Sequence, residues 1–401
     1  MRENELNIPL PLRPLFSDEI VKRLIALRRD LHRDPELSFR EDRTASRLYD
    51  ELARLKPSAL DRLEKNAVVA KIAGRNPRAP TVAVRADIDA LPIQEVTGLP
   101  YSSQNPGVMH ACGHDVHAAW GIGAAYLLAQ RPAEGPVLIV LQPAEEIGKG
   151  ALEILKTGVL DGVFAIFGGH VDRRFPVGQV IAQEGYLAAS TDTFEIGILG
   201  RGAHGARPQE AADPIVAAAA MVGALQTIVS RRLNPSQAGV VTVGTIHAGS
   251  ATNVIPERAA LTGTVRAVDA ETRQLLKTAV TQIADSTAAA YGVKAKIIFD
   301  NGTPPIVNPG EPAQWARQAV LSLLGEKALV PLPGLNMVGE DFAYYLETMQ
   351  GCFLRIGACE EVGKQLPSHS PYFYAAEESI FVGAAVLAET ARRASAALAR
   401  G

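Results

Sequence analysis

Residues 136–146 read Pro-Val-Leu-Ile-Val-Leu-Gln-Pro-Ala-Glu-Glu, and this stretch decides the fold class. The apolar run Val137–Leu141 predicts a strand buried on both faces, which is typical of a parallel sheet covered by helices. The proline at position 143 favours a turn directly after the strand. Two adjacent carboxylates, Glu145 and Glu146, then follow the turn. The stretch therefore predicts an α/β sheet with polar groups at the edge where its strands end.

Similar segments lie on both sides of this stretch. Short apolar runs predict strands at 67–72, 81–84 and 163–167, and helical spacing predicts helices at 17–33, 115–130 and 151–156. This alternation indicates an α/β domain with a mixed, largely parallel sheet and helices on both faces. Further polar candidates follow two of these strands, namely Asp87 with Asp89, and His170. We expect them at the same sheet edge as the two glutamates.

Residues 188–299 have a different order: strand, helix, strand, strand, helix, strand. The predicted strands are 191–199, 240–247, 259–268 and 293–299, and the predicted helices are 213–231 and 269–291. Asp213 before Pro214 is a helix N-cap signal, and Gly292 suits a left-handed helix stop. The order matches the ferredoxin-like β-α-β-β-α-β motif. We expect a small α+β domain of residues 188–299 inserted into a larger domain of residues 1–187 and 300–401.

Composition restricts the classes of partner and compartment. The chain has 401 residues, 47% hydrophobic and 21% charged, with a net charge of −3, which is an ordinary globular composition. It has no basic run for nucleic acid, no apolar core of a signal peptide at its start, and no uninterrupted apolar run of membrane-spanning length. Three cysteines are too few for a disulfide framework. We expect a cytoplasmic protein without nucleic acid or membrane partners.

Residues 109–117, Met-His-Ala-Cys-Gly-His-Asp-Val-His, concentrate metal-binding side chains. Cys112 and His114 are two positions apart, so their side chains converge on an extended segment or loop. Thiolate and imidazole are ligands for divalent transition metals. The alternative is a chance cluster of histidines satisfied in the core. A metal site would take its remaining ligands from carboxylates and histidines elsewhere in the chain.

The paired carboxylates offer two kinds of chemistry. The side chains of Glu145 and Glu146 should point in different directions, so that one can bind metal while the other accepts a proton. A solvated acidic pair is the alternative. Asp87 and Asp89 share a face in extended chain, so they can bind metal or orient metal ligands, or else cap a helix.

Two further histidines are candidates on weaker grounds. His170 follows an apolar strand and two glycines that permit close backbone approach, although a satisfied core histidine is the alternative. His204 lies in the Gly-rich loop 200–208, from which a polar side chain can reach a substrate. The loop by itself is a weak signal.

Five motifs together carry a resemblance to a known family. They are Leu-Arg-Arg-Asp-Leu-His-Arg-Asp-Pro-Glu-Leu at 27–37, Arg-Ala-Asp-Ile-Asp-Ala-Leu-Pro at 85–92, Met-His-Ala-Cys-Gly-His-Asp at 109–115, Pro-Ala-Glu-Glu at 143–146 and Gly-Glu-Asp-Phe at 339–342. In this order they resemble the amidohydrolase branch of the aminoacylase metallopeptidases. That branch includes hippurate hydrolases, N-acyl-amino acid amidohydrolases and plant hydrolases of indole-acetic acid (IAA)–amino acid conjugates.

The resemblance implies roles for individual residues. Two divalent metal ions would be bound by five ligands: Cys112, His114, Glu146, His170 and His369. Glu145 would be the general base, with Asp87 and Asp89 behind the ligands. His204 would match the lid histidine that reaches the active site of a neighbouring subunit and stabilises the oxyanion, and Asn253 the lid asparagine that helps hold substrate. The inserted domain would then be a lid and dimerisation domain, and the protein a homodimer.

Two positions depart from the family pattern. Ala203 stands in the loop usually written Gly-x-Gly-Gly-His-Gly, and Trp120 stands in the helix after the metal loop where smaller residues are common. Neither change removes an expected ligand. Both are expected to affect the substrate pocket more than the reaction.

The function expected from the resemblance is metal-dependent hydrolysis of the amide bond of N-acyl amino acids or related small amides. A metal-activated water would attack the carbonyl, with Glu145 moving the proton. Zinc, manganese, nickel and cobalt all suit the expected ligands. Two alternatives stay open: a dipeptidase, carboxypeptidase or aromatic amine-releasing hydrolase using the same site, and a metal-stabilised binding module without catalysis.

Overall fold

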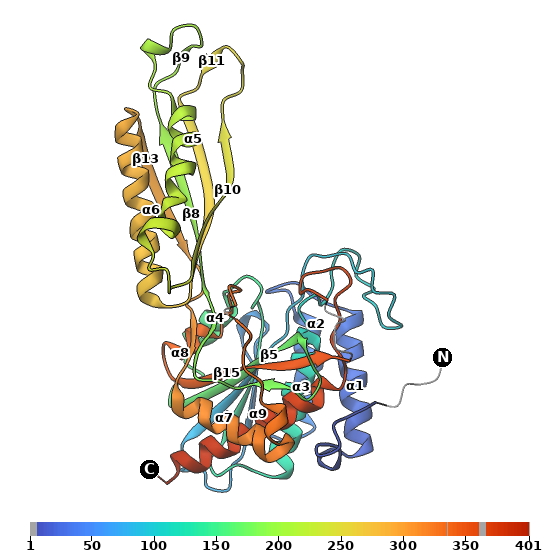
Figure 1. Cartoon of the computed structure of the whole chain (residues 1–401). Helices are drawn as coiled ribbons and strands as arrows, with labels where there is room; N and C mark the ends of the chain where they lie inside the picture. Colours follow the sequence, from blue (N-terminus) through green and yellow to red (C-terminus); the bar gives the residue numbers. More distant parts are fainter. Residues whose placement is uncertain (1–5, 335, 361–365, 401) are drawn as a thin grey trace. The chain divides into compact units, whose positions relative to one another are not determined.

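The computed structural model of the chain describes residues 6–334, 336–360 and 366–400. The chain divides into two compact units (Figure 1). The larger unit comprises Met1–Gly185, Asn308–Pro333 and Tyr344–Gly401, and the smaller comprises Tyr186–Val307 and Gly334–Ala343. Residues 366–378, which contain His369, thus belong to the same unit as the first 185 residues.

A seven-stranded mixed sheet forms the centre of the larger unit. In spatial order its strands are β1 (Ala59–Arg62), β2 (Val68–Ile72), β4 (Val137–Gln142), β3 (Thr81–Asp87), β5 (Val163–Pro176), β15 (Gln350–Cys359) and β6 (Val180–Ile181). The central strands β4, β3, β5 and β15 are parallel, and the remaining pairs are antiparallel. Every residue of β4 is buried, as the apolar run at 137–141 predicted. The predicted α/β class is confirmed.

Helices of the larger unit cover this sheet. They are α1 (Asp18–Arg33), α2 (Asp42–Ala53), α3 (His114–Gln130), α4 (Gly150–Lys156), α7 (Gly310–Leu324) and α9 (Ser379–Leu398). The short α8 (Ala343–Leu346) begins at the last residue of the smaller unit. The helices α3 and α9 pack against each other, and both contact β3 and β5 (Figure 1). The N-terminus of α1 is capped by Ser17, whose side chain accepts the Ile20 N–H at 3.3 Å. The three predicted helices of this unit are therefore present.

The predicted end of one strand is wrong. We expected a strand at 163–167 followed by a loop with His170, whereas β5 continues to Pro176. Gly168 and Gly169 do not end the strand, because they pair in register with Phe353 and Leu354 of β15. A Cβ atom at Gly169 would lie only 3.3 Å from the Leu354 carbonyl oxygen, so the glycine permits close strand approach. His170 is thus held inside a strand.

The smaller unit contains a four-stranded antiparallel sheet in the order β10 (Gly239–Ala248), β12 (Arg258–Ala267), β8 (Ser190–Leu199) and β13 (Lys294–Asn301). Two helices, α5 (Pro214–Leu225) and α6 (Ala270–Ala290), pack on the sheet and on each other (Figure 1). Both expected helix signals are present: Asp213 accepts the Ile215 N–H at 2.8 Å, and Gly292 has φ +67°. The predicted strand and helix order is confirmed.

Short two-stranded sheets complete the fold. One pairs β9 (Ala203–His204) with β11 (Val254–Ile255), and the other pairs β7 (Gly185–Ala188) with β14 (Ile306–Asn308). The first of these brings the loop that carries His204 beside the segment that contains Asn253.

One segment of the smaller unit, Pro214–Arg232, is long and apolar enough to cross a membrane by length and composition. The segment contains Gln226 and Thr227, so it is not an uninterrupted apolar run, and its length arises because the π-helical turn Ile228–Arg232 follows α5. One face of the segment packs in the core of the unit through Ala217, Met221 and Leu225. A core helix meets the same criterion, so one such helix is weak support for a membrane span.

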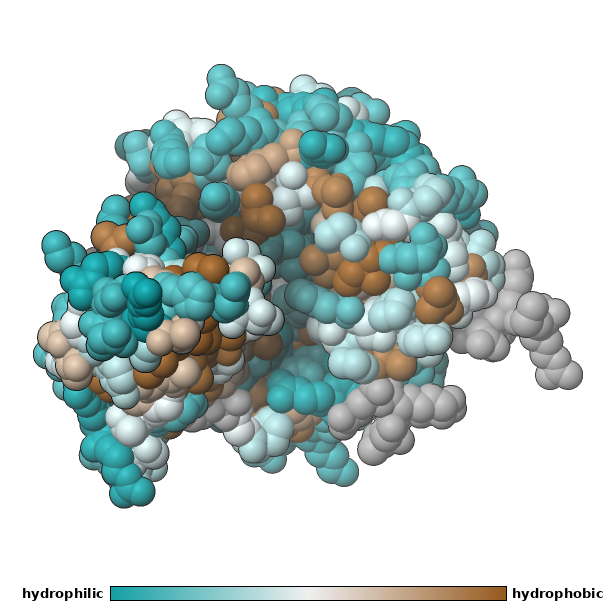
Figure 2. Space-filling model, turned by 90° about the horizontal axis from the view of Figure 1, so that it is seen from above, coloured by the Kyte–Doolittle hydropathy of each residue, from teal (hydrophilic) through white to brown (hydrophobic). Residues whose placement is uncertain are grey.

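Figure 2 shows one face of the protein, on which apolar side chains lie among hydrophilic ones.

Candidate metal centre and active site

The structure brings the five predicted metal ligands together within the larger unit. Their donor atoms form two overlapping groups, Cys112 with His114 and His170, and Cys112 with Glu146 and His369. The Cys112 Sγ lies 3.2 Å from the His170 Nε2, and the His369 Nε2 lies 3.3 Å from a Glu146 carboxylate oxygen. Segments far apart in sequence thus converge on Cys112.

His114 is oriented with one ring nitrogen toward the centre of this cluster. Its Nδ1 lies 2.9 Å from the Asp89 carbonyl oxygen, which leaves Nε2 without a hydrogen-bond partner although the side chain is fully buried. The Glu146 Oε1, 3.9 Å from this Nε2, is buried and unpartnered as well. Buried polar atoms are rarely left unsatisfied, so two facing orphans indicate a ligand between them.

The donor set fits divalent metal ions. Donor atoms bound at about 2.0–2.3 Å around one tetrahedral ion lie about 3.3–3.8 Å apart, which is close to the spacings within the cluster. Burial and the charge of Glu146 raise the pKa of the Cys112 thiol to about 12. A thiolate at this position therefore requires a cation beside it. One thiolate shared by two groups of imidazole and carboxylate ligands suits a two-metal site.

The turn after β4 directs both glutamates to this cluster. Ala144 has the left-handed φ of +56°, and the Glu145 carboxylate lies 3.8 Å from the His114 Nε2. The expectation that the two side chains point in different directions is therefore wrong. It assumed an extended chain, whereas the left-handed residue turns the backbone and lets consecutive carboxylates face one point. Glu145 lies next to the ligands and can exchange protons with a molecule bound there.

Asp89 fixes the backbone of this turn through hydrogen bonds. Its carboxylate accepts the backbone N–H groups of Glu145 and Glu146, each at 3.1 Å, and the Ser38 hydroxyl at 2.6 Å. Despite full burial, which opposes ionisation, hydrogen bonding to His114 lowers the pKa of Asp89. These contacts are those of a residue that orients ligands.

Asp87 orders the histidines. It is the last residue of β3, and its carboxylate lies 2.5 Å from both the Arg85 guanidinium and the His117 Nδ1. Burial opposes the charge of Asp87, but His114, His117 and Arg85 hold its pKa well below the usual range. The other ring nitrogen of His117 accepts the Val171 N–H at 2.9 Å. His117 thereby fixes the backbone beside His170.

Sequence reasoning assigned no role to His117, although its position offered a signal. It lies three residues after His114 on α3, so both histidines share one helix face. Trp120, expected to affect the substrate pocket, is instead fully buried and stacks on His117 with ring centroids 4.3 Å apart. Its bulk fills the core because Gly383 of α9 leaves space for the indole. Among the described histidines of the cluster region, the tryptophan stacks on His117.

The two predicted substrate residues lie in the smaller unit. His204 is exposed and pairs with Val254 in the β9–β11 sheet, where its Nδ1 accepts the Ala206 N–H at 3.0 Å. The Asn253 carbonyl oxygen accepts the Gly205 N–H at 2.7 Å. Both residues are thus presented side by side on one loop pair, and among the described residues the ring Nε2 of His204 has no hydrogen-bond or ion-pair partner.

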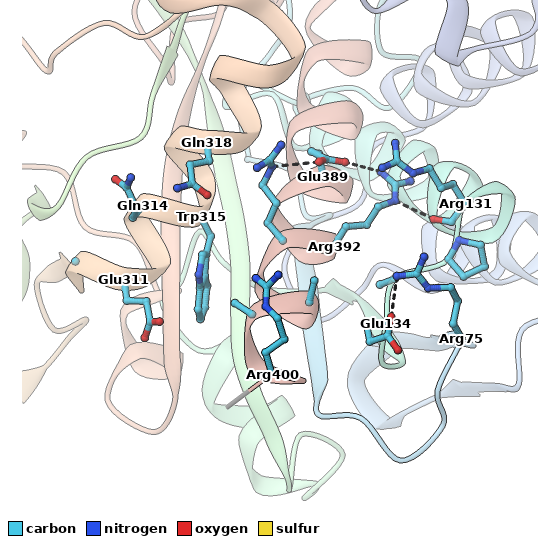
Figure 3. Close-up of a pocket in the computed structure, with 16 residues that line it drawn as sticks. Arg75, Arg131, Glu134, Glu311, Gln314, Trp315, Gln318, Glu389, Arg392 and Arg400 are labelled. Atoms are coloured by element: carbon cyan, nitrogen blue, oxygen red, sulfur yellow. Dashed lines mark hydrogen bonds and ion pairs between the residues drawn. The ribbon is translucent and has the colours of Figure 1, made fainter.

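A groove of about 890 Å³ elsewhere in the larger unit contains none of the predicted site residues (Figure 3). Its wall carries arginines that are paired with acids: Arg75 contacts Glu134 at 2.7 Å, and Arg392 contacts Glu389 at 3.3 Å. Arg392 also donates to the Arg131 carbonyl oxygen at 2.8 Å. None of the groups of described residues that could hold a metal ion lies in this groove, so the chemistry of this protein is assigned to the Cys112 cluster.

Comparisons with known proteins agree with this assignment. The model of "Peptidase family M20/M25/M40" matches residues 83–393. N-acetyl-L-cysteine deacetylase of Bacillus subtilis is 40% identical over 386 residues, covering 95% of this chain and 90% of that protein. IAA-amino acid hydrolase ILR1-like 5 of Arabidopsis thaliana is 38% identical, covering 92% of this chain and 86% of that protein.

A solved structure adds the fold to this likeness. The YXEP protein of Bacillus subtilis, described as a dinuclear metal binding peptidase from the M20 family, superimposes with a TM-score of 0.81 at 38% identity. The alignment covers 94% of this chain and 98% of that one. The sequence match and the superposition both extend over nearly the whole chain, and the resemblance predicted from the five motifs is confirmed. The chain belongs to peptidase family M20/M25/M40 and is a hydrolase of its amidohydrolase group.

Proposed function

We propose that this protein hydrolyses the amide bond of N-acyl amino acids with two divalent metal ions and Glu145 as general base. The observation that carries the proposal is the pair of buried, unpartnered donor atoms, His114 Nε2 and Glu146 Oε1, with the Glu145 carboxylate beside them. Cys112, His114, Glu146, His170 and His369 would bind the ions. Base and ligands in one cluster are the default signature of a hydrolytic site.

The residues divide the reaction between them. Bound divalent ions would lower the pKa of a water molecule and polarise the substrate carbonyl. Glu145 takes the proton of that water as it attacks the carbonyl carbon, and then delivers the proton to the nitrogen of the departing amine. His204 donates to the developing oxyanion, and Asn253 holds the substrate. Asp87 and Asp89 keep the histidines and the glutamate turn in register.

The substrate class follows from the relatives as a proposal. Two of them are named for removing an acyl group from an amino acid, one acetyl and one indole-acetyl. We therefore expect a small N-acyl amino acid, with the smaller unit acting as lid and dimerisation domain of a homodimer. Zinc, manganese, nickel and cobalt can all bind this ligand set, so the metal that supports activity is identified by loading the protein with each one separately.

The test is release of free amino acid from a panel of N-acetyl, N-benzoyl and indole-acetyl amino acids, with dipeptides included. The purified protein is stripped with a chelator and reloaded separately with each of the four metals. We expect release by a reloaded protein and none by the stripped protein. Release from dipeptides alone would favour a dipeptidase, and no release by any reloaded form with metal shown to be bound would contradict hydrolysis at this site.

The role of Glu145 predicts a separation of activity from metal binding. Glu145→Gln keeps the size of the side chain but removes the proton acceptor, so kcat should fall by about 10³-fold or more while two metals per chain stay bound. Glu146→Ala should instead lower the metal content, because it removes a ligand. Elemental analysis beside the kinetic assay checks both. Wild-type turnover in Glu145→Gln would exclude this residue as the base.

A further inference from the structure

Three consecutive backbone N–H groups in the turn after β4 donate to carboxylates from distant parts of the chain. The Ala144 N–H donates to the Glu41 Oε1 at 3.0 Å, and the N–H groups of Glu145 and Glu146 donate to Asp89. Asp89 follows the neighbouring strand β3, whereas Glu41 comes from the start of α2. Two acidic side chains, Asp89 and Glu41, therefore hold the turn that carries the general base. Glu41 takes no part in the proposed hydrolysis itself.

The residue that Glu41 holds has an unfavourable backbone conformation. Ala144 has φ +56°, and a left-handed conformation is unfavourable for an alanine because its Cβ crowds the following carbonyl oxygen. Such a conformation persists only where surrounding contacts enforce it. The Ala144 carbonyl oxygen accepts the Gly150 N–H at 3.1 Å, and the Glu41 carboxylate supplies the contact on the amide side. Relaxation of Ala144 would rotate the following peptide and displace the Glu145 carboxylate.

The side chain of Glu41 does not serve its own helix. The N-terminus of α2 is capped by Glu36, whose carboxylate accepts the N–H groups of Arg43 at 3.2 Å and Thr44 at 2.7 Å. Glu41 is fully buried, and its Oε1 accepts the Phe39 N–H at 2.9 Å as well as the Ala144 N–H. Burying a carboxyl group costs free energy unless the group is hydrogen-bonded, and here its hydrogen bonds are to two loop amides.

We propose that Glu41 is a positioning residue for this hydrolase, and that it holds the left-handed turn at Ala144 so that Glu145 faces the metal ligands. The inference rests on the proposed function, since it concerns the residue assigned there as general base. Glu41 touches neither substrate nor metal in this scheme and acts only through the backbone of the turn. What it contributes is one hydrogen-bond acceptor at a fixed place.

That requirement predicts how substitutions behave. Burial and the charge of Asp89 raise the pKa of Glu41 to about 8, so the side chain is largely protonated at neutral pH and glutamine is a close mimic. Glu41→Gln keeps an acceptor oxygen and should retain at least about a third of wild-type kcat. Glu41→Ala removes the acceptor and should lower kcat about 10²-fold with little change in KM, the loss expected for a displacement of about 1 Å.

Glu36→Ala is the matched control. Glu36 also accepts two backbone N–H groups near the start of α2, but it does not contact the turn at Ala144. Its substitution should lower stability while leaving kcat within about threefold of wild type. If Glu36→Ala lowers kcat as much as Glu41→Ala, or if Glu41→Gln is as inactive as Glu41→Ala, the inference is overturned.

A double-mutant cycle tests the path through Ala144. Ala144→Gly makes the left-handed conformation accessible without the Cβ penalty, so the turn depends less on Glu41. We expect Glu41→Ala to lower kcat clearly less in the Ala144→Gly background than in the wild type. Equal losses in the two backgrounds would show that Glu41 does not act through this residue.

Hydrogen exchange on the metal-free protein provides a readout that does not need activity. Peptides covering residues 143–150 should exchange about tenfold faster in Glu41→Ala, and unchanged in Glu36→Ala and Glu41→Gln. Unchanged exchange in Glu41→Ala would contradict the positioning role even if the wild type is an active hydrolase. Conversely, faster exchange in a protein that hydrolyses none of the substrates would leave the turn assignment standing and reject the proposed function.

Discussion

The chemistry of single residues was predictable where side-chain type and spacing carry it. Cys112, His114 and Glu146 were predicted from their motifs, and the structure brings them into one cluster. Glu41 and the left-handed Ala144 were not, because alanine gives no sequence signal for a positive φ and Glu41 meets the turn only after folding. A residue that acts on the backbone of another segment is hidden in a single sequence.

The buried carboxyl group of Glu41 predicts a pH effect on stability. Its pKa is raised from 4.5 to about 8, so the folded chain holds this proton over a range where the unfolded chain has lost it. Stability from this group is fully present below pH 4.5 and is lost as pH rises through 8. Between pH 5 and 8.5 the wild type should lose a few kcal/mol that Glu41→Gln does not lose, since each pKa unit corresponds to about 1.4 kcal/mol.

Urea unfolding of both metal-free proteins at the two pH values measures this difference. Glu36→Gln is the control, since Glu36 also accepts backbone N–H groups near the start of α2 but is only half-buried. Parallel pH dependence of wild type and Glu41→Gln would show that Glu41 keeps an ordinary pKa.

At the scale of elements, periodicity and cap signals predicted most helices and strands, but not the length of β5. The strand continues through Gly168 and Gly169 because β15, nearly two hundred residues later, pairs with it. Such a partner is invisible in a local window. A contact at the start of α3 also comes from another part of the sequence: Arg28 of α1 binds Asp115 at 2.7 Å, with both side chains buried.

That contact predicts a stability difference between neighbouring arginines of α1. Arg28→Met keeps much of the side-chain volume but leaves the buried Asp115 without its arginine partner, so the free energy of unfolding should fall by about 3 kcal/mol. Arg29, whose side chain is 46% exposed and contacts Glu377, is the matched control, and Arg29→Met should cost under about 1 kcal/mol. Denaturant unfolding compares them, and equal losses would contradict the importance of the buried pair.

At the scale of the whole molecule, the sequence predicted an inserted domain from its strand and helix order alone, and the structure has that order. The assignment of this domain as lid and dimer interface came only from the family resemblance and stays a prediction. The hydrophobic periodicity of a strand predicts which face is buried, but it does not distinguish burial in the chain's own core from burial against a second subunit.

The dimer hypothesis predicts rescue between two inactive variants. If His204 acts in the site of the neighbouring subunit, a mixture of Glu145→Gln and His204→Ala chains should recover part of the wild-type rate after subunits exchange. One site in a mixed dimer then has both residues intact. Absence of rescue, with mixed dimers shown by mass spectrometry of tagged chains, would place His204 in its own subunit's site or outside the reaction.

The position of β15 between β5 and β6 has a consequence during synthesis. The ribosome must add the entire inserted unit before Gln350–Cys359 emerges to fill the gap in the sheet. Until then the nascent chain carries the long edge of β5 unpaired, and His369 has yet to be made. Until β15 pairs with it, the free edge of β5 can pair with other chains, so we expect the partly synthesised protein to be prone to aggregation.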